Sequence, residues 1–221
     1  MLVSPKDLLV NTKNSITIDI MNFLSIDCST DTSSLFIKVK NKTFIKILQS
    51  DKLNNDVLMK KILDFFVENN LKIDDINEVF VNQGPGNFSG LRGSLAVAKG
   101  ISLAKNINLF GYNTFTWLCS SYFGKQDFIY ALIKFREKYY IQKFSKTLRR
   151  ISKIQLIMKD SILQKYKDKF LVFPKSIKKE CDKKILQLNN INIVNLNHNE
   201  LEFLKLKGLL DKDLIKPLYL S

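Results

Sequence analysis

Five of the eight glycines in this 221-residue chain fall within one short stretch, NQGPGNFSGLRGSLAVAKG, at residues 82–100. Glycine is costly inside a helix or strand and is favoured where the backbone needs a positive φ or passes close to another group. The stretch follows an apolar segment with the pattern of a strand, and Ser89 can cap a helix that begins near Gly90. The sequence therefore predicts a tight strand-to-helix joint, which phosphate binding, close packing or catalysis would each explain.

The predicted helix carries small residues along one side. Gly93, Ala96, Gly100 and Ala104 fall at i, i+3, i+7 and i+11, which would let another backbone come close. Such a stripe is more often a packing device than a catalytic one. The loop matches neither GxGxxG nor GxxxxGKS/T, so it carries neither of the common nucleotide-binding fingerprints.

Cysteine usage and hydropathy limit the cellular compartments in which the protein is expected. Its three cysteines, Cys28, Cys119 and Cys181, are odd in number and form no CxxC pair, which argues against a disulfide scaffold or a zinc ribbon. No apolar run approaches the ~20 residues of a membrane span, and the N-terminus lacks the apolar core of a secretory signal. We expect a cytoplasmic protein with no membrane association.

The net charge of +14 is concentrated in the second half of the chain. Residues 1–111 contain 13 Lys and Arg against 11 Asp and Glu, whereas residues 112–221 contain 22 against 10. A basic half of this kind can attract nucleic acid by neutralising phosphates. However, 31 of the 35 basic residues are Lys, and together with abundant Asn and Ile that skew is equally typical of AT-rich codons.

The order of predicted elements indicates the fold class. Residues 23–27 are predicted to form an apolar strand that ends on Asp27, residues 34–49 a hairpin around Asn41-Lys42, and residues 54–70 an amphipathic helix. A strand, the glycine-rich joint with its helix, and a fifth strand follow. This α/β order is that of the ribonuclease-H-like half domain of the actin, hexokinase and Hsp70 superfamily, in which the turn after the first strand faces a phosphate.

The domain organisation follows from this order. Residues 21–111 are predicted to be a complete N-terminal half domain, and residues 112–221 a second, divergent and reduced copy with several short strands and a late helix. Residues 1–20 show no clear period and are predicted to be an N-terminal extension. No glycine- or serine-rich linker separates the halves, so we expect them to pack together.

Several motifs resemble the TsaB (YeaZ) family. They are FLSIDCST, NNDVLMKKILDFF, GPGNFSGLRGSLAVAKGISLA, GYNTF and the closing PLYL, and they cover residues 21–115 well and the last few residues modestly. The resemblance implies a role in the bacterial synthesis of N6-threonylcarbamoyladenosine, made on the tRNA adenosine next to the anticodon. In that family the subunit is not the catalyst: it binds the TsaD transferase, and the ATPase TsaE joins them.

Two departures from the family pattern fit a divergent scaffold. Asn54-Asn55-Asp56 stands where the family has His-Ser-Glu, and Ile133-Lys134-Phe135-Arg136 stands where it has Ile-Asp-Ala-Arg. Both changes remove polar groups that could serve a ligand. The sequence leaves open whether the chain contacts tRNA directly through its basic half, and whether it forms a homodimer when its partner is absent.

The resemblance suggests a partner-binding surface. Helices 54–70 and 89–105 are expected to meet equivalent helices of a TsaD-like partner in a four-helix bundle, with the small residues allowing close approach. The alternative is that the small residues pack against the chain's own sheet. The residues predicted to bind the partner are Leu58, Ile62, Phe65, Gly90, Gly93, Val97 and Gly100.

Three enzymatic alternatives are less well supported. A TsaD-type metal site needs paired histidines, whereas the chain has only His198, predicted to lie at a helix start or on the surface. A peptidase would need that histidine beside a nucleophile. An actin-like ATPase would use Asp27, Gly84 and Gly86, which we take as vestigial, because the second half lacks a matching glycine loop. We therefore predict no catalytic residue, no metal and no cofactor.

Overall fold

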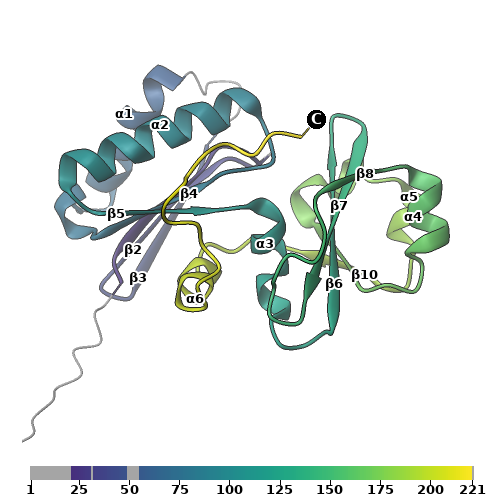
Figure 1. Cartoon of the computed structure of the whole chain (residues 1–221). Coiled ribbons are helices and arrows are strands. Elements are labelled where there is room, and N and C mark those ends of the chain that lie inside the picture. Colours follow the sequence, from purple (N-terminus) through teal and green to yellow (C-terminus); the bar gives the residue numbers. More distant parts are fainter. Residues whose placement is uncertain (1–20, 31, 49–54, 221) are drawn as a thin grey trace, which may run out of the picture.

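The computed structural model describes residues 21–220 apart from residue 31 and residues 49–54. The predicted N-terminal extension at residues 1–20 lies outside the described residues. The described chain forms two five-stranded sheets with helices packed around them (Figure 1). None of its described helices is long and apolar enough to cross a membrane.

The first sheet has the strand order β3-β2-β1-β4-β5. Strands β1, β2 and β3 pair antiparallel, whereas β4 and β5 run parallel to β1. The hairpin predicted around Asn41-Lys42 is present, but it turns one residue earlier, at Lys40 and Asn41, both with positive φ. The strands are β1 (Phe23–Asp27), β2 (Ser34–Val39), β3 (Lys42–Ile47), β4 (Glu78–Asn82) and β5 (Asn108–Tyr112).

The helices of the first half follow the predicted order. A long helix joins β3 to β4, a second joins β4 to β5, and a short helix leads out of β5. This arrangement, with the sheet order above, confirms the ribonuclease-H-like fold. The helices are α1 (Asn55–Glu68), α2 (Phe88–Lys105) and α3 (Thr114–Cys119), with short 3-10 turns at η2 (Ile73–Asp75) and η3 (Ser120–Tyr122).

The second sheet repeats the topology of the first. Its order is β10-β9-β6-β7-β8, in which β6, β7 and β8 pair antiparallel and β9 and β10 run parallel to β6. Its strands are β6 (Phe128–Phe135), β7 (Lys138–Ser145), β8 (Gln155–Ile157), β9 (Leu171–Pro174) and β10 (Ile191–Val194).

The helices that connect β8 to β9 and β9 to β10 are much shorter than α1 and α2, which occupy the equivalent places in the first half. The helix between β8 and β9 has 7 residues where α1 has 14, and the connection from β9 to β10 holds a 3-10 turn and a four-residue helix where α2 has 18 residues. This reduction agrees with the predicted second copy, while the division at residue 111 stays a prediction. These elements are α4 (Lys159–Lys165), η4 (Lys175–Glu180), α5 (Lys183–Leu186) and the final helix α6 (Glu200–Leu206).

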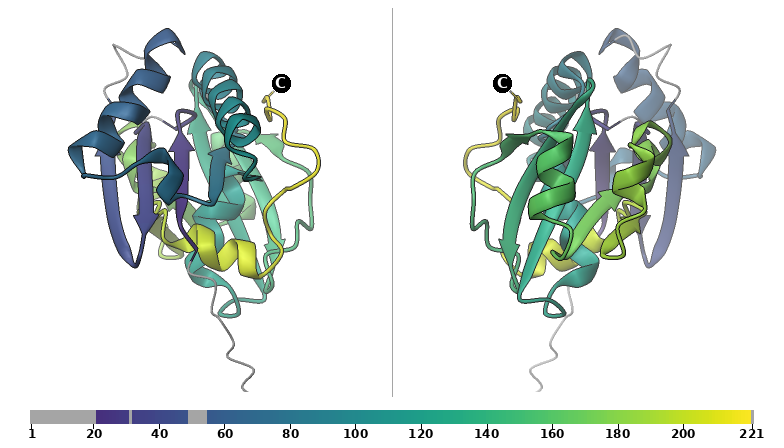
Figure 2. Two further views of the ribbon diagram at one scale, coloured as in Figure 1. Left: turned by 90° about the vertical axis from the view of Figure 1, so that its left-hand side faces the viewer. Right: turned by 90° about the vertical axis from the view of Figure 1, so that its right-hand side faces the viewer.

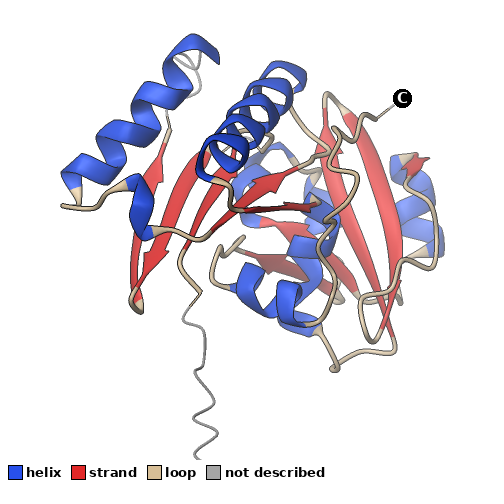
Figure 3. Cartoon of the chain, turned by 60° about the vertical axis from the view of Figure 1, so that its left-hand side comes forward, coloured by secondary structure: helices blue, strands red, loops and turns tan. Residues whose placement is uncertain are grey.

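Each face of the first sheet is covered by a different layer. Alternation along β1 sends Leu24 and Ile26 toward α1 and α2, which lie side by side on one face (Figures 2 and 3). Phe23 points to the opposite face, where a cluster of aromatic side chains packs with α3, α6 and the second sheet. A single core therefore runs from the first sheet into the second half, and α1 and α2 form an outer layer.

The C-terminal segment returns to the first half of the chain. The amides of Gly111 and Asp211 each donate to the other's carbonyl, at 2.7 and 2.8 Å. Farther along, the Leu218 amide donates to the Gln83 carbonyl at 2.7 Å, and Ile215 is buried in the same core cluster as α1 and α2. The yellow trace in Figure 1 follows this path beside β5 and α2. The tail therefore ties the end of the chain to the glycine-rich joint.

Candidate functional site

Asp27 ends β1 and organises the turn that follows it. Its buried carboxylate accepts hydrogen bonds from the Ser29 amide at 3.0 Å, the Ser29 hydroxyl at 2.9 Å and the Asn82 side-chain amide at 3.1 Å, with Thr30 adding two more. Burial raises the pKa of Asp27, and the hydrogen bonds from Thr30 and Ser29 act in the opposite direction. The sequence predicted Asp27 as a vestigial cofactor position; in the structure its carboxylate is bonded to neighbouring groups of its own chain.

The glycine-rich loop lies against this turn in direct main-chain contact. A Cβ on Gly86 would lie 1.9 Å from the Ser29 carbonyl oxygen, and a Cβ on Gly90 would lie 1.9 Å from that of Cys28. The Asn87 amide also donates to the Ser29 carbonyl at 2.9 Å. Gly86 and Gly90 are therefore required for close packing of the two loops.

Gly84 serves the same loop in a different way. It adopts a positive φ of 98°, and its amide donates to the Asn82 side chain at 2.8 Å. A Cβ there would lie 3.0 Å from the Leu218 carbonyl oxygen of the C-terminal tail. Backbone conformation and the nearby tail both favour glycine at this position.

The two predicted phosphate loops leave almost no space between them. As far as the described residues define it, the cavity beside Ser29, Gly86 and Phe135, between the two halves, measures about 20 Å³. That volume holds roughly one water molecule. Gly86 therefore faces little open space here, whereas a larger cavity of about 380 Å³ adjoins the same turn at Thr30.

The N-terminus of α2 differs in detail from the prediction. The sequence suggested Ser89 as the cap, but Asn87 takes that role: its side chain accepts from the Ser89 amide at 3.0 Å, and the helix begins at Phe88. Asn87 adopts an extended conformation at φ −60° and ψ 121°, as an N-cap residue does. The loop contact with Ser29 fixes the backbone of Asn87, and this tertiary contact is not readable from local sequence.

Five of the seven residues predicted to bind a partner pack against other parts of the chain itself. Leu58, Ile62 and Phe65 are buried in the core beneath α1, Gly93 is buried on α2, and Gly90 packs on the Cys28 backbone. Helical periodicity marks the face that packs on the sheet and does not distinguish it from a partner surface, so partner binding by these residues stays a prediction. Of the remaining two, Val97 is half-buried and Gly100 is exposed, with nothing within 4 Å of an added Cβ.

The outward side of the helix pair carries exposed apolar and small residues that the prediction missed. Val67 is 73% exposed and Leu103 is 83% exposed, although both are large apolar side chains. The sequence did hold a signal for this surface: each helix carries apolar residues at positions that do not fall on the helical stripe packed against the sheet. We call this set the helix-pair surface: Leu63 and Val67 of α1, and Ala96, Gly100, Leu103 and Ala104 of α2.

His198 lies at the start of α6, as one of the two predicted alternatives had it, but it is buried, so the alternative of a surface position is wrong. Its Nε2 lies 2.9 Å from the Ser34 hydroxyl and its Nδ1 lies 3.0 Å from the Ser25 hydroxyl, while its ring stacks on Phe36. Burial lowers the pKa of His198 to about 3, so the ring is neutral at pH 7. A serine hydroxyl at Nδ1 takes the place that an orienting carboxylate has in a catalytic triad.

No metal-binding cluster occurs in the described part of the chain. Within residues 21–30, 32–48 and 55–220, no group of three or more His, Cys, Asp or Glu side chains could hold a metal ion. The three cysteines are buried free thiols. Burial raises the pKa of Cys28 to about 12, so this thiol stays protonated near neutral pH.

Sequence comparisons relate part of the chain to a tRNA-modification system. A family model described as "TsaD: tRNA N6-adenosine threonylcarbamoyltransferase" matches residues 50–135. Two curated Buchnera aphidicola proteins are named tRNA threonylcarbamoyladenosine biosynthesis protein TsaB. The one from subspecies Baizongia pistaciae is 35% identical over 86 residues, and the one from Schizaphis graminum is 29% identical over 106 residues. The matches span 38% and 46% of this chain and 38% and 49% of those relatives' length.

Structural comparison extends the likeness over most of the chain. YeaZ from Pseudomonas aeruginosa superposes with a TM-score of 0.65 at 15% identity, covering 91% of this chain and all of the other. A second structure, described as an uncharacterised protein with similarity to peptidase YeaZ from P. aeruginosa, gives a TM-score of 0.66 at 15% identity with the same coverage. At this identity the superposition shows the shared fold.

Proposed function

Since the chain belongs to the TsaB/YeaZ family, we propose that it is a non-catalytic subunit required for N6-threonylcarbamoyladenosine modification of tRNA. In this proposal it acts in the cytoplasm by binding a TsaD-like threonylcarbamoyl transferase, and a TsaE-like ATPase joins the complex. The names of its curated relatives and the transferase family model support this assignment.

The helix-pair surface is the observation that carries the proposal. Large apolar side chains such as Val67 and Leu103 remain in water although α1 and α2 already bury a full face against the sheet. Covering apolar surface contributes roughly 25 cal/mol per Å², so association with a second apolar surface would be favourable. The exposed small residues Ala96, Gly100 and Ala104 on α2 would let a partner helix approach closely.

The state of the loops supports a non-catalytic role. The carboxylate of Asp27 is bonded within its own turn, and Gly86 packs on the Ser29 backbone instead of facing an open phosphate site. The alternative of an actin-like ATPase would require these loops to separate. A peptidase is also disfavoured, because His198 is buried with its pKa lowered to about 3, and its Nδ1 contacts the Ser25 hydroxyl instead of a carboxylate.

A reconstituted modification reaction tests the proposal. Unmodified tRNA, a threonylcarbamoyl donor, the TsaD-like transferase and the TsaE-like ATPase of the same organism would be incubated with and without this chain, and the modified nucleoside measured by mass spectrometry. We expect product only when the chain and the transferase are both present. Product formed by the chain alone, or equal product without it, would contradict the proposal.

A homodimer through the same surface is compatible with this role. A second copy covering Val67 and Leu103 would have to leave before the transferase binds. Sedimentation at several protein concentrations would detect such a dimer, and addition of the transferase should dissociate it. If the homodimer remained intact with the transferase bound, self-association would have to use a different surface of the chain.

A further inference from the structure

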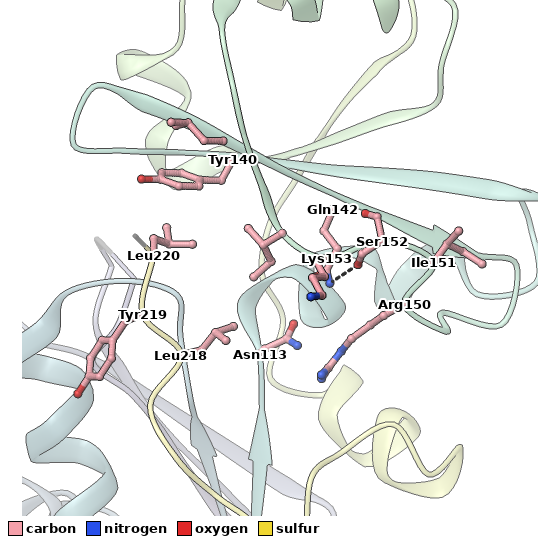
Figure 4. Close-up of a pocket in the computed structure, with 12 residues that line it drawn as sticks. Asn113, Tyr140, Gln142, Arg150, Ile151, Ser152, Lys153, Leu218, Tyr219 and Leu220 are labelled. Atoms are coloured by element: carbon pink, nitrogen blue, oxygen red, sulfur yellow. Dashed lines mark hydrogen bonds between the residues drawn. The ribbon is translucent and has the colours of Figure 1, made fainter.

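A cavity of about 580 Å³ lies between the C-terminal tail and the side of the second sheet that faces the first half (Figure 4). Its volume falls in the range of small-molecule sites. Four parts of the chain line it: the end of β5, strand β7, the segment from residue 150 through β8, and the tail. Its lining residues include Asn113, Tyr140, Gln142, Arg150, Lys153 and Leu220.

The cavity has a polar end and an apolar end. Figure 4 shows Asn113, Gln142, Lys153 and Arg150 grouped on one side, with the Arg150 side chain running toward Asn113. Tyr140 and Leu220 lie together on the other side, and Leu156 and Leu218 add further apolar surface. The arrangement suits a ligand with an anionic, hydrogen-bonding part and a flat apolar part.

Polar groups at the first end have unused bonding capacity. Gln142 is only 4% exposed and its Nε2 donates to the Ser152 carbonyl at 3.0 Å, but its buried Oε1 accepts from no described residue. Such an unpaired acceptor is destabilising, and a ligand N–H or a water molecule could relieve it. The position of the amide is fixed by its bond to Ser152, so Oε1 cannot exchange places with Nε2 without losing that bond.

Two cationic side chains, Arg150 and Lys153, lie at the same end, and neither forms a close ion pair with another residue of the described chain. Arg150 has its nearest carboxylate at Asp211, 3.9 Å away, at the limit of an ion pair. Lys153 is exposed and makes no ion pair with any residue of the described ranges. A pair of cations at one end of a cavity favours a phosphate monoester or diester over a neutral ligand.

The walls of the cavity are held in place by contacts outside it. The backbone amide of Leu218 donates a hydrogen bond to the Gln83 carbonyl, and Gln83 Nε2 donates to the Lys216 carbonyl at 3.0 Å. Asn113 caps α3 by accepting from the Thr116 amide at 2.7 Å. Tyr219 also lines the cavity, and its ring stacks on Phe88 of α2. A ligand would enter a largely preformed site.

We propose that this cavity binds a nucleoside phosphate, either as a free mononucleotide or as an unpaired nucleotide of RNA. Arg150 and Lys153 would hold the phosphate, and the Asn113 and Gln142 amides would meet the polar edge of the base. The base would lie against Tyr140 and the leucines. The site is separate from the helix-pair surface and does not depend on transferase binding.

Titration calorimetry of the full chain with AMP, with a short single-stranded RNA and with inorganic phosphate tests the proposal. Arg150→Ala with Lys153→Ala should weaken binding roughly tenfold or more, as expected for loss of charged hydrogen bonds. Lys178→Ala with Lys179→Ala removes the same charge elsewhere in the second half and should leave the affinity unchanged. Leu156→Trp should block the cavity, whereas Met158→Trp nearby on the exposed surface should not.

The three probes identify the source of the ligand. Binding of AMP supports a free nucleotide, and binding of RNA alone supports a nucleotide within RNA. Failure of both to bind, or equal loss of affinity in the Lys178/Lys179 control, would overturn the proposal. If inorganic phosphate bound as tightly as AMP, the proposed contacts with the nucleoside would be refuted. Thermal unfolding of each variant confirms that the measured protein is folded.

Discussion

The carbonyl oxygen of Ser29 lies where a side chain on Gly86 would begin, 1.9 Å from the position of a Cβ atom. Gly90 has the same relationship with the Cys28 carbonyl. Two glycines of the clustered stretch therefore allow the loop after β4 to rest directly on the turn after β1.

Alanine at these glycines should destabilise the chain. Gly86→Ala and Gly90→Ala each place a methyl group inside contact distance of rigid main chain, and overpacking of this kind costs ~1–3 kcal/mol. For a chain of this size, a loss of 1 kcal/mol corresponds to a fall of about 2–4 °C in Tm. Differential scanning calorimetry of each variant checks the prediction.

Gly100→Ala is the matched control. Nothing lies within 4 Å of its Cβ position, and alanine is favoured over glycine in a helix by roughly 0.5–1 kcal/mol. We expect its Tm to stay level or rise. Equal destabilisation by all three substitutions would show that the close main-chain contacts do not determine the requirement for glycine.

Stability should fall in mild acid because of His198. The unfolded imidazole takes up a proton below pH 6.5, whereas the buried ring, with its pKa lowered to about 3, does not. The unfolded state then binds more protons, so the free energy of unfolding decreases by about 1.4 kcal/mol for each pH unit below 6.5. Urea unfolding at pH 7 and pH 5 should differ by roughly 2 kcal/mol from this group.

The variant His198→Gln isolates this effect. The raised pKa of Asp27 has the opposite effect: the folded state binds this proton more readily than the unfolded state, so this group adds to the free energy of unfolding as the pH falls. That contribution is the same in the wild type and in His198→Gln. The wild type should lose more stability than His198→Gln between pH 7 and pH 5. Parallel pH profiles would refute a buried neutral histidine.

The C-terminal tail should contribute measurably to stability. Ile215 is 7% exposed within the core of the first half, so Ile215→Ala should cost about 2–4 kcal/mol. Leu214→Ala is the control, because Leu214 is 67% exposed and its truncation should change stability by less than about 0.5 kcal/mol. Chemical denaturation of both variants decides. Similar values would mean that the tail does not pack as described.

The sequence was sufficient for the fold where its patterns are local. Alternating apolar residues mark the hairpin of β2 and β3, and the 3.6-residue period of α1 reports the face that lies on the sheet. For the second half the sequence predicted only a reduced copy with several short strands and a late helix, because α4 and α5 are too short to give a clear helical period.

Tertiary contacts explain what sequence reasoning missed. His198 lies 164 positions after Ser34, and nothing near it in the chain indicates that two serines and Phe36 surround it. Likewise, the approach of Ser29 selects Asn87 over Ser89 as the helix cap. Close approach was predicted for the stripe that includes Gly100, where nothing lies within 4 Å of an added Cβ, whereas Gly86 and Gly90 are the glycines that contact backbone of the same chain.

Titration of the TsaD-like transferase against surface variants tests the central claim most directly. Val67→Asp and Gly100→Leu should fold normally and weaken binding at least about tenfold, because each disrupts the close apolar contact proposed for the helix-pair surface. Met158→Asp is the control, since Met158 is 73% exposed like Val67 but lies just after β8. The account predicts that this control binds as tightly as the wild type. Absence of wild-type binding, or wild-type affinity in Val67→Asp and Gly100→Leu, would contradict it.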